Sequence, residues 1–256
     1  MSTLQELLQK ADTYKEKISA ARPLEKEELK SLDNYFRIGF TYSSNALEGN
    51  TLTISETKIL LEDGITVGGK PLKDCYEAVG HGDAYDYMLD LARQQDMTIT
   101  EETIKRLHQL FYQRVDSEKA GRYRSIQVFI SGTDYIPPSP AEVPQLMSHM
   151  IDQLRSSRTT LHPIELAAMA HKRLVDIHPF VDGNGRIARL LMNLILVNAG
   201  YGVVSIPPVW RNDYINALSA SRRLNDMEPF SKLIAECVIE TERDYCRLLK
   251  LYKYIY

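Results

Sequence analysis

Residues 178–189 bring together the side chains that could hold a polyphosphate. Gly183 and Gly185 permit turns that aim several backbone N–H groups into one concavity, just ahead of a predicted helix. The N-terminus of that helix adds a partial positive charge. Arg186 and Arg189 are three residues apart and so share one helix face. Two guanidiniums beside such a nest suit a polyphosphate better than a single carboxylate.

The other polar residues of this segment could supply a base and a metal ligand. Asn184 lies between the two glycines and tolerates the same turn geometry. Asp182 can hold Mg²⁺, whose other ligands would be phosphate oxygens and water. His178 precedes the nest and can take a proton from an attacking hydroxyl near neutral pH. Together these groups favour phosphoryl-type transfer, which depends mainly on positioning and charge stabilisation.

Two other kinds of site are excluded for this segment, because the residues that each requires are missing. Read as an EF-hand calcium loop, it would place Phe180 and Leu191 at the first and last positions, so both essential carboxylates are missing. No Gly-Lys-Ser/Thr follows the glycines, as a Walker P-loop requires. A helix-flanking His, a Gly-x-Gly turn or a surface Arg pair is ordinary by itself, and it is their coincidence in twelve residues that indicates a site.

The segment resembles the signature of the Fic family, His-x-Phe-x-Asp/Glu-Gly-Asn-Gly-Arg-x-x-Arg, with every defined position filled. The resemblance covers the helical core from about residue 70 to 235. It implies a protein adenylyltransferase that moves AMP from ATP to a Ser, Thr or Tyr hydroxyl of a target protein. It also implies that His178 is the general base, that Asp182 binds Mg²⁺ and that Phe180 anchors the loop. The nucleotide-binding residues that it implies are Gly183, Asn184, Gly185, Arg186, Arg189 and Tyr214.

Residues 44–49, Ser-Asn-Ala-Leu-Glu-Gly, resemble the inhibitory motif of the same family, Ser/Thr-x-x-x-Glu-Gly/Asn, with Ser44 and Glu48 at its defined positions. The motif ends a predicted helix on the N-terminal side of the core. By this resemblance Glu48 pairs with Arg189 and takes the place of the γ-phosphate, so that ATP binds with its α-phosphate misdirected. The resemblance further implies that Glu48 can position a water that removes AMP from a target. The alternative is a glutamate at a helix end without a partner.

Residues 121–139 differ from the rest because a short β-prone run, 126–130, is followed by a four-residue turn and two prolines. This pattern predicts a β-hairpin. It resembles the family's flap, where an extended stretch of the target adds beside a strand edge. An ordinary structural hairpin is the alternative. The predicted target-docking residues are Ile130, Ser131, Gly132, Thr133, Asp134, Tyr135 and Ile136.

Helical periodicity dominates the remaining sequence, so we expect an all-α fold, a Fic-type helical bundle with a small β-hairpin flap. We predict an N-terminal helical region with the inhibitory helix over 1–65 and the catalytic core with C-terminal helices over 66–256. Ser2 is expected to cap the first helix. The predicted helices cover about 3–21, 26–45, 55–62, 72–94, 101–114, 140–155, 164–177, 185–198, 211–223 and 229–250.

Composition narrows the function further. The 256 residues carry a formal net charge of −3, without the basic surplus of a nucleic-acid binder. No apolar leader and no run of about 18 apolar residues is visible, so we expect a cytoplasmic protein without a membrane span. Its expected partners are ATP and a target protein, and a homo-oligomer is compatible with the sequence. Two alternatives stay open: a phosphotransferase on the same scaffold, and a non-catalytic nucleotide-sensing domain.

Overall fold

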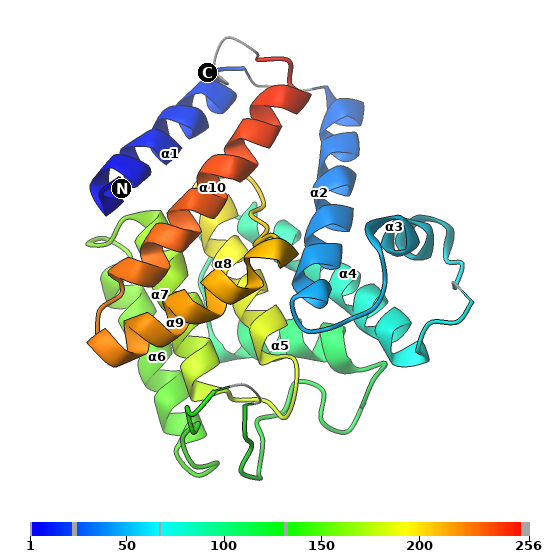
Figure 1. Cartoon of the computed structure of the whole chain (residues 1–256), viewed down its shortest axis with the longest axis vertical. Coiled ribbons are helices and arrows are strands. Elements are labelled where there is room, and N and C mark those ends of the chain that lie inside the picture. Colours follow the sequence, from blue (N-terminus) through cyan, green and yellow to red (C-terminus); the bar gives the residue numbers. More distant parts are fainter. Residues whose placement is uncertain (1, 22–24, 67, 131–132, 252–256) are drawn as a thin grey trace.

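The computed structural model describes residues 2–21, 25–66, 68–130 and 133–251. These residues form a bundle of helices with no strand, which confirms the predicted all-α class (Figure 1). None of the described helices has both the length and the apolarity needed to cross a membrane. The helices are α1 (Leu4–Ala20), α2 (Lys26–Ala46), α3 (Ile54–Asp63), α4 (Leu72–Ala92), α5 (Glu101–Tyr112), α6 (Val143–Ser157), α7 (Pro163–Ile177), α8 (Asn184–Asn198), η1 (Pro208–Trp210), α9 (Arg211–Leu224) and α10 (Glu228–Leu248).

Two predicted helix starts are wrong. Thr3, not Ser2, caps α1, because its hydroxyl accepts the Glu6 N–H while the Glu6 carboxylate accepts the Thr3 N–H at 2.8 Å. Helix α6 begins at Val143 rather than at Pro140. A turn precedes it, in which the Glu142 carboxylate accepts the N–H of Ser139 at 2.8 Å. At α1 a side-chain oxygen sets the boundary by satisfying a free N–H group of the helix, whereas at α6 the turn over 139–142 delays the start.

Helix α8 lies in the middle of the bundle, with α4 and α7 packed against it (Figure 1). It is apolar nearly all round, and such a helix is stable only when protein surrounds it. Four polar side chains are buried on it: Asn184, Arg186, Arg189 and Asn193. The Asn193 amide is satisfied by the main chain of Val204, with bonds of 2.7 and 2.9 Å. The two arginines need counter-charges from other elements.

Helix α1 lies along α10, although the two helices are at opposite ends of the sequence (Figure 1). One hydrophobic cluster contains residues of both helices, of α2 and of the central α8. A smaller cluster, formed around Leu52, Leu60, Cys75 and Ala78, joins α3 to α4. Apolar packing therefore runs across residue 65, and the division predicted there stays a prediction.

The predicted β-hairpin is wrong for the described residues, since Ile130, Thr133, Asp134, Tyr135 and Ile136 belong to no strand. Ser131 and Gly132 lie outside the described residues. We call residues 126–138 the flap loop.

Side chains rather than a backbone ladder hold the two arms of this loop. Arg124 donates to the carbonyls of Ile126 and Pro138, at 3.0 and 2.5 Å, and Gln127 donates to that of Pro137 at 3.0 Å. Pro137 and Pro138 have no N–H group to offer a facing strand. The carbonyls of Ile126, Pro137 and Pro138 are therefore taken, and the two prolines offer no N–H group to a ladder.

The central position of α8 gives a stability prediction. Leu191 on α8 is fully buried, so we expect Leu191→Ala to lower the free energy of unfolding by about 2–5 kcal/mol. Leu224, at the end of α9, is 59% exposed, and Leu224→Ala should change it by no more than about 0.5 kcal/mol. Urea unfolding of both variants measures this difference. Equal losses in the two variants would contradict the central placement of α8.

Candidate active site

The loop between α7 and α8 is shaped by two residues with positive φ. His178 ends α7 with φ 51° and ψ 58°, and Gly183 precedes α8 with φ 80°. A side chain at Gly183 would be strained because of the positive φ, and its Cβ would lie 2.7 Å from the Phe111 ring. Phe180 is fully buried, and its ring stacks on that of His108 at 3.8 Å between centroids. The loop is thus fixed at both ends and in its middle.

Asn184 braces this loop through its side chain. Its Oδ1 accepts the N–H of Phe180 and its Nδ2 donates to the Phe180 carbonyl, both at 2.9 Å. The predicted phosphate contact of Asn184 is therefore left to its main chain. His108 braces the same loop from α5, where Nδ1 accepts the Gly121 N–H at 2.9 Å and Nε2 donates to the Asp182 carbonyl at 3.1 Å. Burial lowers the pKa of His108 to about 4, so the ring is neutral at pH 7.

The His178 imidazole has the form that a general base needs. Its Nδ1 lies 3.2 Å from the Val175 carbonyl, and we assign the ring proton to this nitrogen from that contact. Nε2 is then left with its lone pair. Burial lowers the pKa of His178, and the carbonyl of Val175 opposes this only in part. The ring is therefore neutral near pH 7 and able to accept a proton at Nε2.

Arg186 lies in the first turn of α8 and is 3% exposed. Its NH1 pairs with Glu77 of α4 at 2.9 Å, and its NH2 pairs with Asp182 at 3.1 Å. The guanidinium also lies over the Phe111 ring, 4.6 Å from the ring centroid. Arg186 is thereby fixed in place beside the glycine turn with a carboxylate on each side.

Arg189 lies one turn further along α8 and is fully buried. Its Nε donates to the Ser44 hydroxyl at 3.0 Å and its NH2 to the Ser44 carbonyl at 2.8 Å. The same NH2 pairs with Glu48 Oε1 at 2.7 Å. Gly185 allows this approach, because a Cβ there would lie 2.3 Å from Glu48 Oε1. The structure therefore brings the residues of the two sequence motifs into direct contact.

The Glu48 carboxylate is ionised under ordinary conditions. Burial favours its neutral form, but the charges of Arg189 and Arg186 outweigh burial and lower its pKa below the usual value. Of the Glu48 side chain, 36% stays accessible to solvent, which weakens the pair relative to a fully buried one. Glu48 is thus the solvent-facing member of this ion pair, and Arg189, the inner member, has no access to water.

Tyr214 lies behind Arg189, in the protein interior. Its hydroxyl is 3.4 Å from Arg189 NH1 and 3.1 Å from His171 Nε2, and its ring packs at an angle on Phe230. The expected role of Tyr214 in a nucleoside pocket stays a prediction. These contacts show that it also supports the buried guanidinium.

Asp182 lies at the open side of the loop. Its Oδ1 accepts the Gly183 N–H at 2.6 Å, and its Oδ2 lies 3.4 Å from Lys73 Nζ. Burial raises the pKa of Asp182, but the Arg186 charge and the Gly183 N–H lower it by more, so the carboxylate is ionised. Lys73, Glu77 and His108 were not predicted from the sequence, because each is a single residue in an unremarkable helical stretch.

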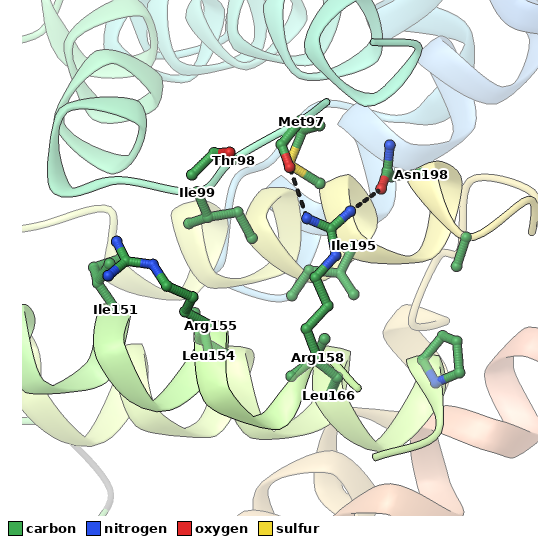
Figure 2. Close-up of a pocket in the computed structure, with 12 residues that line it drawn as sticks. Met97, Thr98, Ile99, Ile151, Leu154, Arg155, Arg158, Leu166, Ile195 and Asn198 are labelled. Atoms are coloured by element: carbon green, nitrogen blue, oxygen red, sulfur yellow. Dashed lines mark hydrogen bonds between the residues drawn. The ribbon is translucent and has the colours of Figure 1, made fainter. Parts of the chain in front are cut away.

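A separate concavity of about 390 Å³ lies at the far ends of α7 and α8 (Figure 2). Its floor is apolar, and the guanidinium of Arg158 projects across it. Arg158 donates to the Met97 carbonyl at 2.8 Å and to Asn198 Oδ1 at 3.1 Å, so these donors are already used within the protein. No histidine or carboxylate lines this concavity, so the groups suited to group transfer are those around the α7–α8 loop.

Comparisons with known proteins agree on one family. The Fic/DOC family model matches residues 98–196. The protein adenylyltransferase Fic of Nematostella vectensis is 38% identical over 253 residues, which are 97% of this chain and 57% of that protein. The Drosophila melanogaster protein of the same name is 40% identical over 201 residues, which are 78% of this chain and 40% of that protein. This chain spans about half the length of these curated relatives.

Solved structures show the same relation over the whole bundle. A Fic domain containing signaling protein from Bacteroides thetaiotaomicron has a TM-score of 0.87 at 33% identity, covering 94% of this chain and 98% of that one. Fic-1 from C. elegans has a TM-score of 0.86 at 30% identity, covering 97% of this chain and 73% of that one.

The electrostatics of Glu48 give a pH prediction. Because the folded protein lowers the pKa of Glu48, ionised Glu48 stabilises the fold above its unfolded pKa, and this stabilisation is lost as pH falls through the folded pKa. We expect Glu48→Gln to be less stable than wild type at pH 7. The difference should shrink as pH falls through the lowered pKa of Glu48, below which the wild-type carboxyl is protonated. Urea unfolding at several pH values tests this, and a difference that grew toward acid pH would contradict the pairing.

Proposed function

The chain belongs to the Fic/DOC family, and on that premise we propose that it is a protein adenylyltransferase held inactive by its own Glu48. The reaction would move AMP from ATP to a hydroxyl of a target protein. The observation that carries the proposal is the pair of buried guanidiniums of Arg186 and Arg189 beside the glycine turn that opens α8. The names of relatives that are 38–40% identical support the same activity.

In the proposed reaction the target hydroxyl attacks the α-phosphorus of ATP in line with the leaving diphosphate. The hydroxyl proton passes to Nε2 of His178, which is the neutral acceptor in the assigned tautomer. A new O–P bond forms on AMP while the bond from the α-phosphorus to the bridging oxygen breaks. Arg186 neutralises the charge that develops on the diphosphate, and Arg189 holds its γ-phosphate end.

Asp182 is the residue that we propose to hold Mg²⁺. Its Oδ2 faces the open side of the loop, where Lys73 is its one cationic contact at 3.4 Å. A single carboxylate suits Mg²⁺, which keeps several waters and takes its remaining ligands from substrate phosphates. When bound, the ion would supply charge neutralisation on the diphosphate.

We infer that Glu48 inhibits the transfer by competition for one guanidinium. Glu48 Oε1 occupies Arg189 NH2 at 2.7 Å, and the Arg189 side chain has no solvent-exposed surface. A γ-phosphate can therefore seat fully on Arg189 only when Glu48 moves away. ATP bound beside Glu48 would be displaced along the nest, with its α-phosphate out of line with His178.

The flap loop is the proposed docking place for the target segment. Three large apolar side chains project from it with 59–78% exposure: Ile126, Phe129 and Ile136. Tyr135 fixes the second arm, since its hydroxyl donates to the Asp176 carbonyl at 2.9 Å at the end of α7. An extended segment lying on this loop would present a Ser, Thr or Tyr near His178.

Removal of AMP is a second candidate activity. Glu48 Oε1 is bound to Arg189, 36% of the Glu48 side chain is exposed, and its charge acts to raise the pKa of His178. A carboxylate in this position could orient a water against an AMP group already on a target. A cytoplasmic location, a homo-oligomer and the absence of nucleic-acid or membrane partners stay predictions.

The first functional prediction concerns the inhibitory pair. Glu48→Gly should raise AMP transfer by roughly tenfold or more, because Arg189 becomes available to a γ-phosphate. His178→Ala should abolish transfer even in the Glu48→Gly background, because the hydroxyl keeps its proton. Intact-mass analysis after incubation with ATP and Mg²⁺ reads out self-modification, and α-phosphate-labelled ATP reads out other targets.

Glu118→Gly is the matched control, since it removes an exposed carboxylate from a turn outside the two sequence motifs. It should leave labelling at the wild-type level. A phosphate adduct in place of an AMP adduct would favour the phosphotransferase alternative. ATP binding without any adduct in Glu48→Gly would favour the nucleotide-sensing alternative.

The second functional prediction concerns the metal. In the Glu48→Gly background, Asp182→Asn should raise the Mg²⁺ concentration for half-maximal transfer by roughly tenfold or more. Asp63→Asn, an exposed change at the end of α3, should leave it unchanged. Initial rates across a Mg²⁺ titration measure both, and an unchanged midpoint in Asp182→Asn would remove this role.

A further inference from the structure

Arg124 is a buried cation whose hydrogen-bond acceptors are all main-chain oxygens. It is 3% exposed, and no carboxylate pairs with it among the described residues. A guanidinium removed from water is costly unless its donors are satisfied. Such an arrangement holds backbone in place rather than neutralising charge, and it is separate from the phosphate-binding pair on α8.

Two of its contacts lie on the loop that carries the proposed base. Arg124 Nε donates to the His178 carbonyl at 2.8 Å, and its main-chain N–H donates to the Pro179 carbonyl at 2.9 Å. The other two lie on opposite arms of the flap loop. NH1 donates to the Ile126 carbonyl at 3.0 Å and NH2 to the Pro138 carbonyl at 2.5 Å. One side chain thus joins both arms of the flap loop to the residue that bears the imidazole.

His178 needs such support because its backbone is left-handed, with φ 51°. A non-glycine residue in this region is disfavoured and persists only where its surroundings impose it. The His178 N–H is held by the Leu174 carbonyl at 2.8 Å, and the Arg124 guanidinium holds the His178 carbonyl. Together these bonds fix the peptide groups on both sides of His178, and hence the direction of its ring.

We propose that Arg124 is a positioning residue that couples the seating of a target segment on the flap loop to the alignment of the His178 ring for proton removal. A segment that presses on the flap loop moves the carbonyls of Ile126 and Pro138. These carbonyls share their guanidinium with the carbonyl of His178. The proposal rests on the AMP transfer proposed above.

A structural role alone would predict a different pattern. Loss of packing at Arg124 would lower stability and weaken ATP binding together with turnover. A positioning role predicts a lower kcat with the KM for ATP unchanged, because Arg124 touches neither Arg186 nor Arg189. The geometry of proton removal would change while the phosphate cradle stays intact.

The pH profile provides a second readout. Burial lowers the pKa of His178, the charge of Arg124 lowers it further, and the Val175 carbonyl, Glu48 and Asp182 raise it. Replacing Arg124 by an uncharged residue therefore raises the pKa of His178. Since the base must be neutral, the acid limb of the kcat profile should move to higher pH. Arg124→Lys keeps the charge and should leave this limb close to its original position.

The experiment uses the full chain in the Glu48→Gly background. Arg124→Met should lower kcat by roughly 10- to 100-fold while the KM for ATP stays within about twofold. Arg124→Lys should recover only part of kcat, since a lysine cannot reach both the flap loop and residue 178. Arg122→Met, an exposed change two residues away, should behave as its parent. A kcat equal to that of the Glu48→Gly parent and an unmoved acid limb in Arg124→Met would overturn the proposal.

Two further measurements keep the outcome decisive. If Arg124→Met does not fold, Arg124→Lys decides alone: a lower kcat with unchanged KM for ATP supports positioning, and an unchanged kcat refutes it. NMR titration of the His178 ring needs no turnover. It therefore tests the effect of Arg124 on His178 even when Glu48→Gly makes no AMP adduct. An inactive Glu48→Gly parent would refute the proposed function, whereas an unmoved His178 titration in Arg124→Met would refute the role of Arg124.

Discussion

A fully buried guanidinium, that of Arg189, sets the main physical constraint on this protein. It lies inside a largely apolar bundle, where an uncompensated charge would be strongly destabilising. Ser44 and Glu48, from the end of α2, supply the acceptors that make its burial tolerable. The same requirement defines the ligand, because a molecule that displaces Glu48 must bring negative charge to the same place. In the function that we propose, inhibition by Glu48 and recognition of a phosphate both meet this need of Arg189 for negative charge.

The proposed chemistry depends equally on the loop between α7 and α8, whose backbone is held in place. His178, Phe180 and Gly183 are each fixed by contacts from other elements, and most of these contacts are to main-chain atoms. His108 and Arg124 supply several of them from α5 and from the segment before the flap loop. The two arginines that we propose to bind phosphate lie on the central helix α8, so the coupling proposed through Arg124 acts on His178 and not on these guanidiniums.

Part of the site could be predicted, because the residues concerned belong to short motifs that are local in the sequence. The signature around Arg189 and the motif that contains Glu48 each carry recognisable spacing, and the structure brings the two together. The contribution of Glu77 and Arg124 could not be predicted, since each acts on a residue remote in sequence and has no pattern around it. Residues 126–130 mislead for the same reason: their β-propensity is local, whereas side-chain bonds and two prolines decide their conformation. Apolar periodicity predicted most helix boundaries well, but it missed the start of α1, which a side-chain cap sets, and that of α6, which follows a turn.

Calorimetric binding of a non-transferable ATP analogue and of ADP to wild type and to Glu48→Gly tests the central claim most directly. If Glu48 holds the place of the γ-phosphate on Arg189, removing it should strengthen binding of the triphosphate several-fold more than binding of the diphosphate. An equal gain for both nucleotides, or none for either, would contradict the account, because Glu48 would then be excluding no particular phosphate.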